Sequence, residues 1–199
     1  MAEIKSTLEK VLERAARMEA DGDSGELVAE EKVREGMRTG ATYMRGEPVD
    51  LLAALDERPV EERVYFVKGV AGALLRNIML PHGDSQQEAS GLAMKGLVQI
   101  GQGHSDLLTL FADLTKILDQ FIQHRKQLKE QLEANFAQMM PQLEAAMAQK
   151  TGREIKLQPS QHPKFQEEWQ KVIDDLNGQY GQAVEQHKQM AVKILTGMV

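Results

Sequence analysis

The sequence predicts an all-α protein, in which a compact group of short helices is followed by a long antiparallel helical hairpin. Apolar residues recur at spacings of three and four, which place them on one face of a helix. Glycine and glutamine are unevenly divided, because 12 of the 16 glycines lie at or before Gly103 and 15 of the 19 glutamines follow it. Since glycine weakens helices and permits turns, whereas glutamine is a good helix former, we expect short helices first and long ones afterwards.

Two long apolar patterns predict the hairpin. One begins at Ser105 and the other at Pro163, and a polar connection of about a dozen residues joins them. The chain is therefore expected to consist of a bundle of short helices over residues 1–103 and a hairpin over residues 104–199. The pattern leaves open whether these two parts pack as one domain.

The first two predicted helices lie before residue 45. The opening helix has an apolar face with helical spacing, formed by Ile4, Leu8, Val11, Leu12 and Ala15. The Asp- and Gly-rich run over residues 21–25 ends it. A second helix is expected over residues 26–44, where Gly36 and Gly40 lie one turn apart. Because the surrounding segment is not apolar enough for a membrane helix, this spacing predicts a close crossing with another helix.

Prolines and acidic residues mark the next two helices. Pro48 and Asp50 introduce a short helix that continues through Leu55. Pro59 suits the first turn of the following helix, because proline has no backbone N–H to be satisfied there. Glu61 and Glu62 complement the positive end of the helix dipole.

That following helix carries the most apolar stretch of the chain and is expected to form the core of the first half. It is predicted to reach Ile78, three residues before the next proline. Ser85 and Glu88 have the spacing of a capping box for a further helix. Gly101 and Gly103 are predicted to end it.

The first helix of the hairpin is predicted to start with Ser105 as its N-cap. Its apolar seam has heptad-like steps, typical of coiled-coil packing, and one seam position holds Arg125. Pro141 interrupts the pattern, so the helix either kinks there or stops and is followed by a short helix to Lys150. The returning helix is expected to end near Leu195.

Apolar residues remain outside this single seam, namely Leu108, Leu110, Ile117 and Ile122. Something must cover them, which is the basis for a homodimer hypothesis. The sequence leaves open whether the hairpin packs on the first half or on a second copy of the chain.

Composition favours a cytoplasmic protein that binds neither nucleic acid nor membranes. The formal net charge is −6 and there is no cysteine, so disulfides, thiolate catalysis and iron–sulfur ligation are not expected. No stretch reaches the length of an apolar membrane span, and no signal-peptide core follows the N-terminus. The cluster of His124, Arg125, Lys126 and Lys129 is a local basic patch, which we interpret as solvated helix surface.

No pattern points to catalysis or to a cofactor. The sequence contains no phosphate-binding loop, dinucleotide fingerprint or nucleophile elbow. His124 and His187 fall on the two long helices and could approach each other, but two ligands make an incomplete zinc site. Adjacent acidic residues point about 100° apart around a helix and do not present two carboxylates to one substrate. We therefore expect no enzyme, no metal and no cofactor.

Methionines cluster near the tip of the predicted hairpin, at Met139, Met140 and Met147, and are followed by Ile155 and Leu157. Methionine surfaces adapt to varied partners, so these five residues are candidates for binding a peptide or client protein. The alternative is that the methionines are core residues.

The segments EIKSTLEKVLERAARM and GALLRNIMLP resemble a family of uncharacterised, mainly helical bacterial cytosolic proteins, a domain of unknown function. The resemblance covers residues 2–81. It implies a helical, cytosolic protein, and it implies no activity, cofactor or site residue.

Together these observations predict a non-catalytic protein–protein interaction protein, a scaffold or adaptor that acts through its long helical hairpin and associates with a protein partner or with itself. The alternative function is a small-molecule or metal-binding helical bundle.

Overall fold

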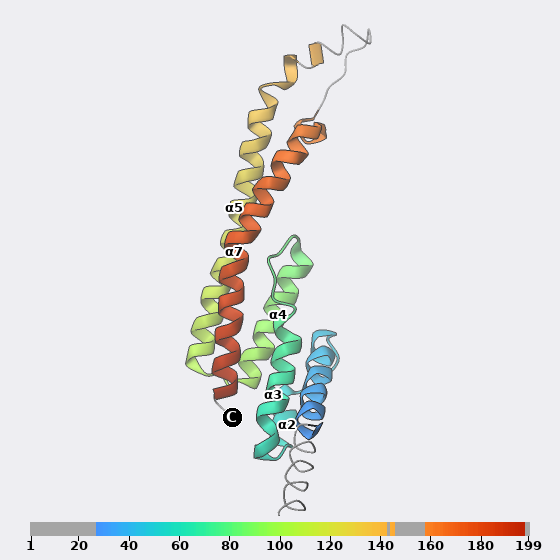
Figure 1. Ribbon diagram of the computed structural model, residues 1–199, viewed down its shortest axis with the longest axis vertical. Coiled ribbons are helices and arrows are strands. Elements are labelled where there is room, and N and C mark those ends of the chain that lie inside the picture. Colours follow the sequence, from blue (N-terminus) through green and yellow to red (C-terminus); the bar gives the residue numbers. More distant parts are fainter. Residues whose placement is uncertain (1–26, 143, 146–157, 198–199) are drawn as a thin grey trace, which may run out of the picture. The chain divides into compact units, whose positions relative to one another are not determined.

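The computed structural model describes residues 27–142, 144–145 and 158–197, which are drawn in colour in Figure 1. The described residues contain no strand, so the predicted all-α class is confirmed. The opening helix predicted around residues 4–15 lies outside the described residues. The described helices are a helix over residues 27–44, α2 Leu51–Asp56, α3 Val60–Leu75, α4 Asp84–Ile100, α5 Ser105–Ala137, the 3₁₀ turn η1 Pro159–Gln161 and α7 Pro163–Gly197.

These elements form two compact units. Unit 1 contains the described residues up to 77, together with Leu92–Leu107 and residues 192–197. Unit 2 contains Ile78–Gly91 and the described part of Leu108–Ala191. The helices α4, α5 and α7 therefore each contribute residues to both units.

In unit 1, the helix over residues 27–44 crosses α3 at very short range. A Cβ atom added to Gly36 would collide with the backbone carbonyl oxygen of Phe66, and one added to Gly69 would collide with that of Val33. Only glycine permits backbones to approach this closely. The close crossing predicted from the spacing of Gly36 and Gly40 is thus confirmed, with a third glycine supplied by α3.

The core of unit 1 is built on α3, as the sequence predicts. The fully buried side chains of α3 include Phe66, Val67, Val70 and Leu74. They are accompanied by buried residues of the other elements of this unit, which are Leu51, Leu55, Ala93, Leu97, Ile100, Leu107 and Leu195.

The short helix predicted after Asp50 is confirmed as α2, whereas the predicted end of α3 is wrong. Asp50 accepts hydrogen bonds from the backbone N–H groups of Leu52 at 2.9 Å and Ala53 at 3.1 Å. Helix α3 ends at Leu75 and does not reach Ile78. Its last carbonyls are instead satisfied by Asn77, whose backbone N–H donates to the carbonyl of Leu74 and whose side-chain amide donates to that of Ala73.

The predicted capping box of α4 is also wrong. The helix begins at Asp84, so Ser85 already lies inside the first turn. A different side chain closes this end, because Oε1 of Gln86 accepts a hydrogen bond from the backbone N–H of His82 at 2.7 Å.

The predicted end of α4 is confirmed and forms a Schellman motif. The N–H of Gly103 donates to the carbonyl of Val98, and the N–H of Gln102 donates to that of Gln99. Gln102 has φ 52°, in the left-handed region, and Gly103 has φ 69°. A glutamine therefore occupies the position at which glycine is usual.

Ser105 is the first residue of α5 and not its N-cap, so this prediction is wrong by one position. The residue before it, His104, uses Nδ1 to accept a hydrogen bond from the backbone N–H of Asp106 at 3.3 Å. A histidine here replaces the hydroxyl or carboxylate cap that the sequence rules favour.

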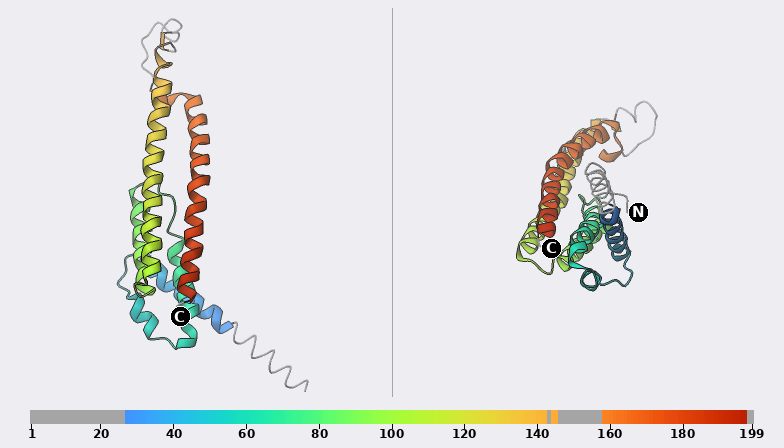
Figure 2. Two further views of the ribbon diagram at one scale, coloured as in Figure 1. Left: turned by 90° about the vertical axis from the view of Figure 1, so that its left-hand side faces the viewer. Right: turned by 60° about the horizontal axis from the view of Figure 1, so that its bottom comes forward.

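In unit 2, α5 and α7 lie side by side and run in opposite directions, as Figures 1 and 2 show. The rings of Phe121 and Tyr180 have centroids 5.5 Å apart, and those of Phe136 and Phe165 are 5.4 Å apart. The two residue numbers add up to 301 in each pair, which defines an antiparallel register. The connection over residues 146–157 lies outside the described residues, so the complete hairpin stays a prediction.

The structure shows that the long helix stops before Pro141 and that a new helical segment follows, which was the second of the two alternatives predicted for this proline. Helix α5 ends at Ala137, and the N–H of Met139 closes a turn on the carbonyl of Phe136 at 2.9 Å. The chain is helical again over residues 140–142 and 144–145. Pro141 thus lies in the first turn of a new helix, where its missing N–H costs no hydrogen bond.

Candidate functional site

A hollow of unit 1 lies between the helix over residues 27–44 and α3. Its volume is about 660 Å³. We call it the helix groove, and it is lined by Ala29, Glu30, Val33, Arg34, Met37, Tyr65 and Lys68. This volume is within the roughly 300–1,000 Å³ that is typical of ligand pockets.

The glycine crossing explains why the groove exists. Two packed helices cross at an angle, so they separate on either side of their closest point. Gly36 and Gly69 set that point, and the groove opens towards the start of the helix over residues 27–44. Val33 and Met37 are left half-buried in its floor, and Tyr65 stays 41% exposed.

Charged side chains border this apolar floor. Arg34 and Glu30 lie one turn apart and form an ion pair at 3.7 Å, in which both side chains are mostly exposed. Lys68 is exposed on α3, one turn from Tyr65. An apolar centre with methionine and tyrosine, bordered by an arginine, matches the composition of protein–protein interfaces.

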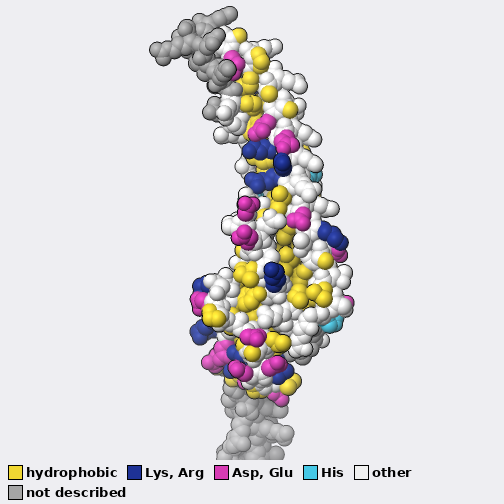
Figure 3. Space-filling view, turned by 180° about the vertical axis from the view of Figure 1, so that it is seen from behind, with side chains coloured by type: hydrophobic (Ala, Val, Ile, Leu, Met, Phe, Trp, Pro, Cys, Tyr) yellow, Lys and Arg dark blue, Asp and Glu magenta, His cyan; other side chains and the backbone are white. Residues whose placement is uncertain are grey.

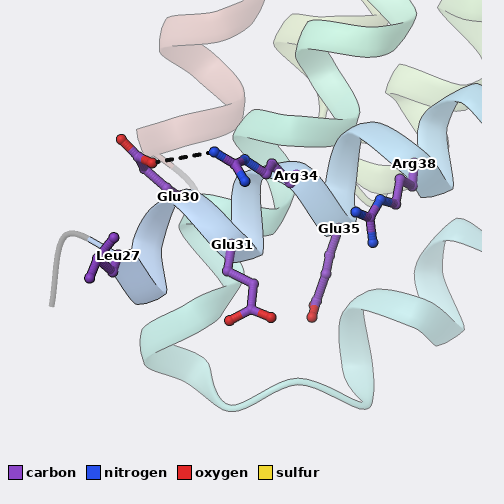
Figure 4. Close-up of a pocket in the computed structure, with 6 residues that line it drawn as sticks. All are labelled: Leu27, Glu30, Glu31, Arg34, Glu35 and Arg38. Atoms are coloured by element: carbon purple, nitrogen blue, oxygen red, sulfur yellow. Dashed lines mark ion pairs between the residues drawn. The ribbon is translucent and has the colours of Figure 1, made fainter. Parts of the chain in front are cut away.

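A second hollow, of about 350 Å³, lies on another side of the same helix. Figure 4 shows its lining residues, Leu27, Glu30, Glu31, Arg34, Glu35 and Arg38. The carboxylates of Glu31 and Glu35 extend to the same side of the helix, away from the Glu30–Arg34 pair. No group of three or more residues in the described part of the chain has the arrangement needed to hold a metal ion.

Glu35 belongs to a structural network. Its carboxylate lies 3.4 Å from Lys32 and 3.4 Å from Arg58, and Lys32 also reaches Glu62 at 3.3 Å. The hydrogen bond to Glu62 is the main cause that raises the pKa of Lys32 above its usual value. The Arg58 guanidinium lies 3.7 Å from the ring centroid of Phe66. These contacts tie the helix over residues 27–44 to the start of α3.

Some of the exposed apolar side chains of unit 1 lie at or near the helix groove. Tyr65 lines it at 41% exposure, and Leu27 and Val28, at 66% and 48%, begin the helix that forms one of its walls. Val60, at 69%, lines the smaller pocket of unit 1 instead. Figure 3 shows that hydrophobic side chains lie open to solvent between acidic and basic ones on one face of the molecule. Single exposed apolar residues are ordinary, but several beside an apolar groove indicate a binding surface.

Unit 1 also has a smaller pocket of about 230 Å³ at the end of α4. Its walls are mainly apolar, and its polar members are Arg63 and Gln102. The Arg63 guanidinium already donates to the backbone carbonyls of Asp56 and Arg58. This volume is below the usual range for ligand pockets, and the Arg63 guanidinium is already hydrogen-bonded. The pocket is therefore a poor small-molecule site.

The structure separates the two described methionines predicted at the hairpin tip. Met139 is 52% exposed. Met140 is 6% exposed and packs in an apolar cluster with Phe136 and Phe165, as the core alternative predicts for it. The remaining three candidates lie outside the described residues, namely Met147, Ile155 and Leu157.

The histidines and the basic patch of α5 do not converge on a site. The rings of His124 and Tyr180 have centroids 6.2 Å apart. His187 lies near Asp113 instead, where it is a minor cause that lowers the pKa of this carboxyl. In the antiparallel register, His124 and His187 therefore lie about 15 Å apart along the helices. Lys126 and Lys129 each pair with a glutamate one turn on, at 3.9 and 3.8 Å, as expected for solvated helix surface.

Comparison with known proteins identifies the family. No curated protein and no solved structure matches the chain. No helix in the described part of the chain is long and apolar enough to cross a membrane. The family match begins inside α2 and continues through most of α7. Of the residues 2–81 that carried the resemblance it includes only residues 52–81, so the opening segment EIKSTLEKVLERAARM lies outside it. Because this match covers residues 52–193, more than half of the chain, the protein belongs to the Family of unknown function (DUF6657).

Proposed function

We propose that this protein is a non-catalytic protein–protein interaction protein, a scaffold or adaptor, and that the helix groove binds an amphipathic helix of its partner. The observation that supports this proposal is the apolar floor of the groove, with Val33 and Met37 half-buried and Tyr65 exposed beside charged residues. Such a floor is unfavourable in contact with water, and it is stabilised when a partner covers it.

A helix suits the shape and chemistry of this groove. Its floor runs from Ala29 to Met37, about 12 Å along the helix, and accommodates two turns of a partner helix. A bound helix would place apolar residues at i, i+3/i+4 and i+7 on the floor. The flexible side chain of Met37 can adapt to several such sequences. Lys68 and Arg34 favour an acidic flank on the partner.

The other parts of the sequence-based prediction belong to the same proposal. The long helices α5 and α7 provide a stiff platform, and Met139 offers a second, smaller contact point. A cytoplasmic, bacterial setting and self-association are included in the proposal as the sequence predicts them.

Quantitative affinity purification tests the proposal. The tagged full chain would be compared with the double variant Tyr65→Ser/Lys68→Glu, in which both altered side chains are exposed. The matched control is Met190→Ser/Lys126→Glu, which changes the same kinds of side chain on unit 2. We expect at least one partner to fall tenfold or more with the groove variant and to remain with the control. Equal partner profiles for both variants would refute the groove as the binding site.

A further inference from the structure

Helix α7 contains two glycines, Gly178 and Gly181, that its packing does not require. A Cβ atom added to either would meet no described atom within 4 Å beyond its own helical turn. At Gly36 and Gly69, by contrast, the added atom would collide with a backbone carbonyl. Glycine weakens a helix interior, because its backbone gains more freedom when the helix opens. Two such residues within one turn therefore make this part of α7 easier to open.

The contact between α5 and α7 has a second weakness at the same level. In the antiparallel register, Arg125 of α5 lies opposite Leu176, about 3 Å along the axis from Gly178. Nε of Arg125 and Oδ1 of Asn177 are both buried with no hydrogen-bond partner among the described residues. Buried polar atoms that are left unpaired weaken the packing between two helices.

The surrounding parts of the two helices are regular. Helix α5 contains no glycine over Ser105–Ala137, and α7 is helical without a break over Pro163–Gly197. The rings of Phe121 and Tyr180 pack edge to face, with centroids 5.5 Å apart. Tyr180 lies between the two glycines, so this ring contact can hold the helices together while the backbone around it opens. In Figure 1 the orange first part of α7 is inclined to its red last part.

Several residues at one level thus oppose stability without a packing reason, and such places are expected to serve a function. We infer that residues 177–181 form a hinge in α7, at which the part of unit 2 towards Phe136 and Phe165 moves relative to the part towards Val184. The platform of α5 and α7 is then stiff on either side of one softer level, and it can adjust to partners of different shape. The hinge does not depend on the helix groove.

Hydrogen exchange of the full chain, followed by mass spectrometry, tests the hinge. Amides that open locally exchange faster than amides that are exposed only when the whole protein unfolds. Opening of the hinge breaks the helical hydrogen bonds of the amides over residues 178–185. We expect these amides to exchange at least about tenfold faster than those over residues 186–191 of the same helix. They should exceed the amides over residues 116–123, which lie opposite on α5, by a similar factor.

Three variants separate the hinge from a general change in stability. Gly178→Ala/Gly181→Ala should slow exchange over residues 178–185 by about tenfold or more. Arg125→Met should slow it by about fivefold, because no buried donor then remains unpaired on α5. The matched control is Gly91→Ala, since Gly91 also lies in a helix of unit 2 with open space around it. This control should change exchange over residues 178–185 by less than about twofold, because α4 stays closed when the hinge opens.

Two results would overturn the inference. One is equal exchange of the three segments in the unaltered chain, which would show that α7 has no weak level. The other is that Gly91→Ala slows exchange over residues 178–185 as much as Gly178→Ala alone does, because these amides would then be exposed only by global unfolding.

Discussion

Arg125 is the polar exception in the apolar seam of α5, and its replacement by methionine should make the protein more stable. Its Nε atom is buried without a hydrogen-bond partner among the described residues. Its one described hydrogen bond is a long one, from Nη1 to the backbone carbonyl of His82 at 3.4 Å. The antiparallel register places it opposite Leu176, next to Asn177, whose Oδ1 is also buried without a partner.

The magnitude follows from two opposing effects. Leaving a buried donor unsatisfied costs about 1–3 kcal/mol, and the methionine side chain removes that cost while keeping much of the arginine's length. Loss of the long hydrogen bond to His82 reduces this gain in stability by about 1 kcal/mol. Replacing buried ionic groups by apolar ones is stabilising by up to about 4 kcal/mol in other proteins. Because Arg125 is only partly buried, we expect a net gain near the low end, about 1 kcal/mol.

Urea denaturation followed by circular dichroism measures this gain as an increase in the midpoint at constant slope. For a chain of this length, 1 kcal/mol corresponds to a rise of about 2–4 °C in the melting temperature. Lys126→Met is the matched control, since the Lys126 side chain is 76% exposed and its replacement should change stability by less than about 0.5 kcal/mol. A loss of more than about 1 kcal/mol in Arg125→Met would refute the reasoning and show that this residue holds the 78–91 segment in place.

Three further predictions concern single positions. Gly36→Ala should destabilise the protein by about 2 kcal/mol or more, because its new methyl group collides with a backbone carbonyl. Gly178→Ala, in an open part of α7, should stabilise the protein by about 0.5–1 kcal/mol. Equal urea midpoints for the two variants would contradict this prediction. Gln102→Gly should stabilise the protein by about 0.5–1 kcal/mol, because its φ of 52° suits glycine, and a lower melting temperature would show that the side chain itself contributes. The hydrogen bond from Lys116 is the main cause that lowers the pKa of Asp113, so this carboxylate stabilises the fold above its unfolded pKa, and the stabilisation is lost as the pH falls through the folded pKa. Lys116→Gln should raise the Asp113 pKa in an NMR titration, and an unchanged value would disprove this cause.

Local interactions explain which parts of the fold could be predicted from the sequence. The start of α2 after Asp50 and the helix end around Gly103 depend on residues within one turn, so the pattern alone identifies them. The wrong predictions arose where several neighbouring side chains compete for the same backbone groups. Asn77 ends α3 early, and Gln86 replaces the predicted capping box of α4.

The candidate site depended on tertiary structure to a greater extent. The sequence indicated that Gly36 and Gly40 allow a close crossing, but it did not identify α3 as the partner or show that the two helices separate around Val33 and Tyr65. It also assigned the same role to adjacent methionines, of which the structure buries Met140 and exposes Met139. A one-residue step turns a helix by about 100°, which is enough to move a side chain from the core to the surface.

The helical class, the approximate bounds of the helices and their apolar faces could be predicted from the sequence, because these properties depend on residues three or four positions apart. Which apolar faces are covered, and which one is left open as the helix groove, follows from the tertiary packing of the helices. That choice depends on how closely two backbones approach, and here three glycines on two helices set the distance.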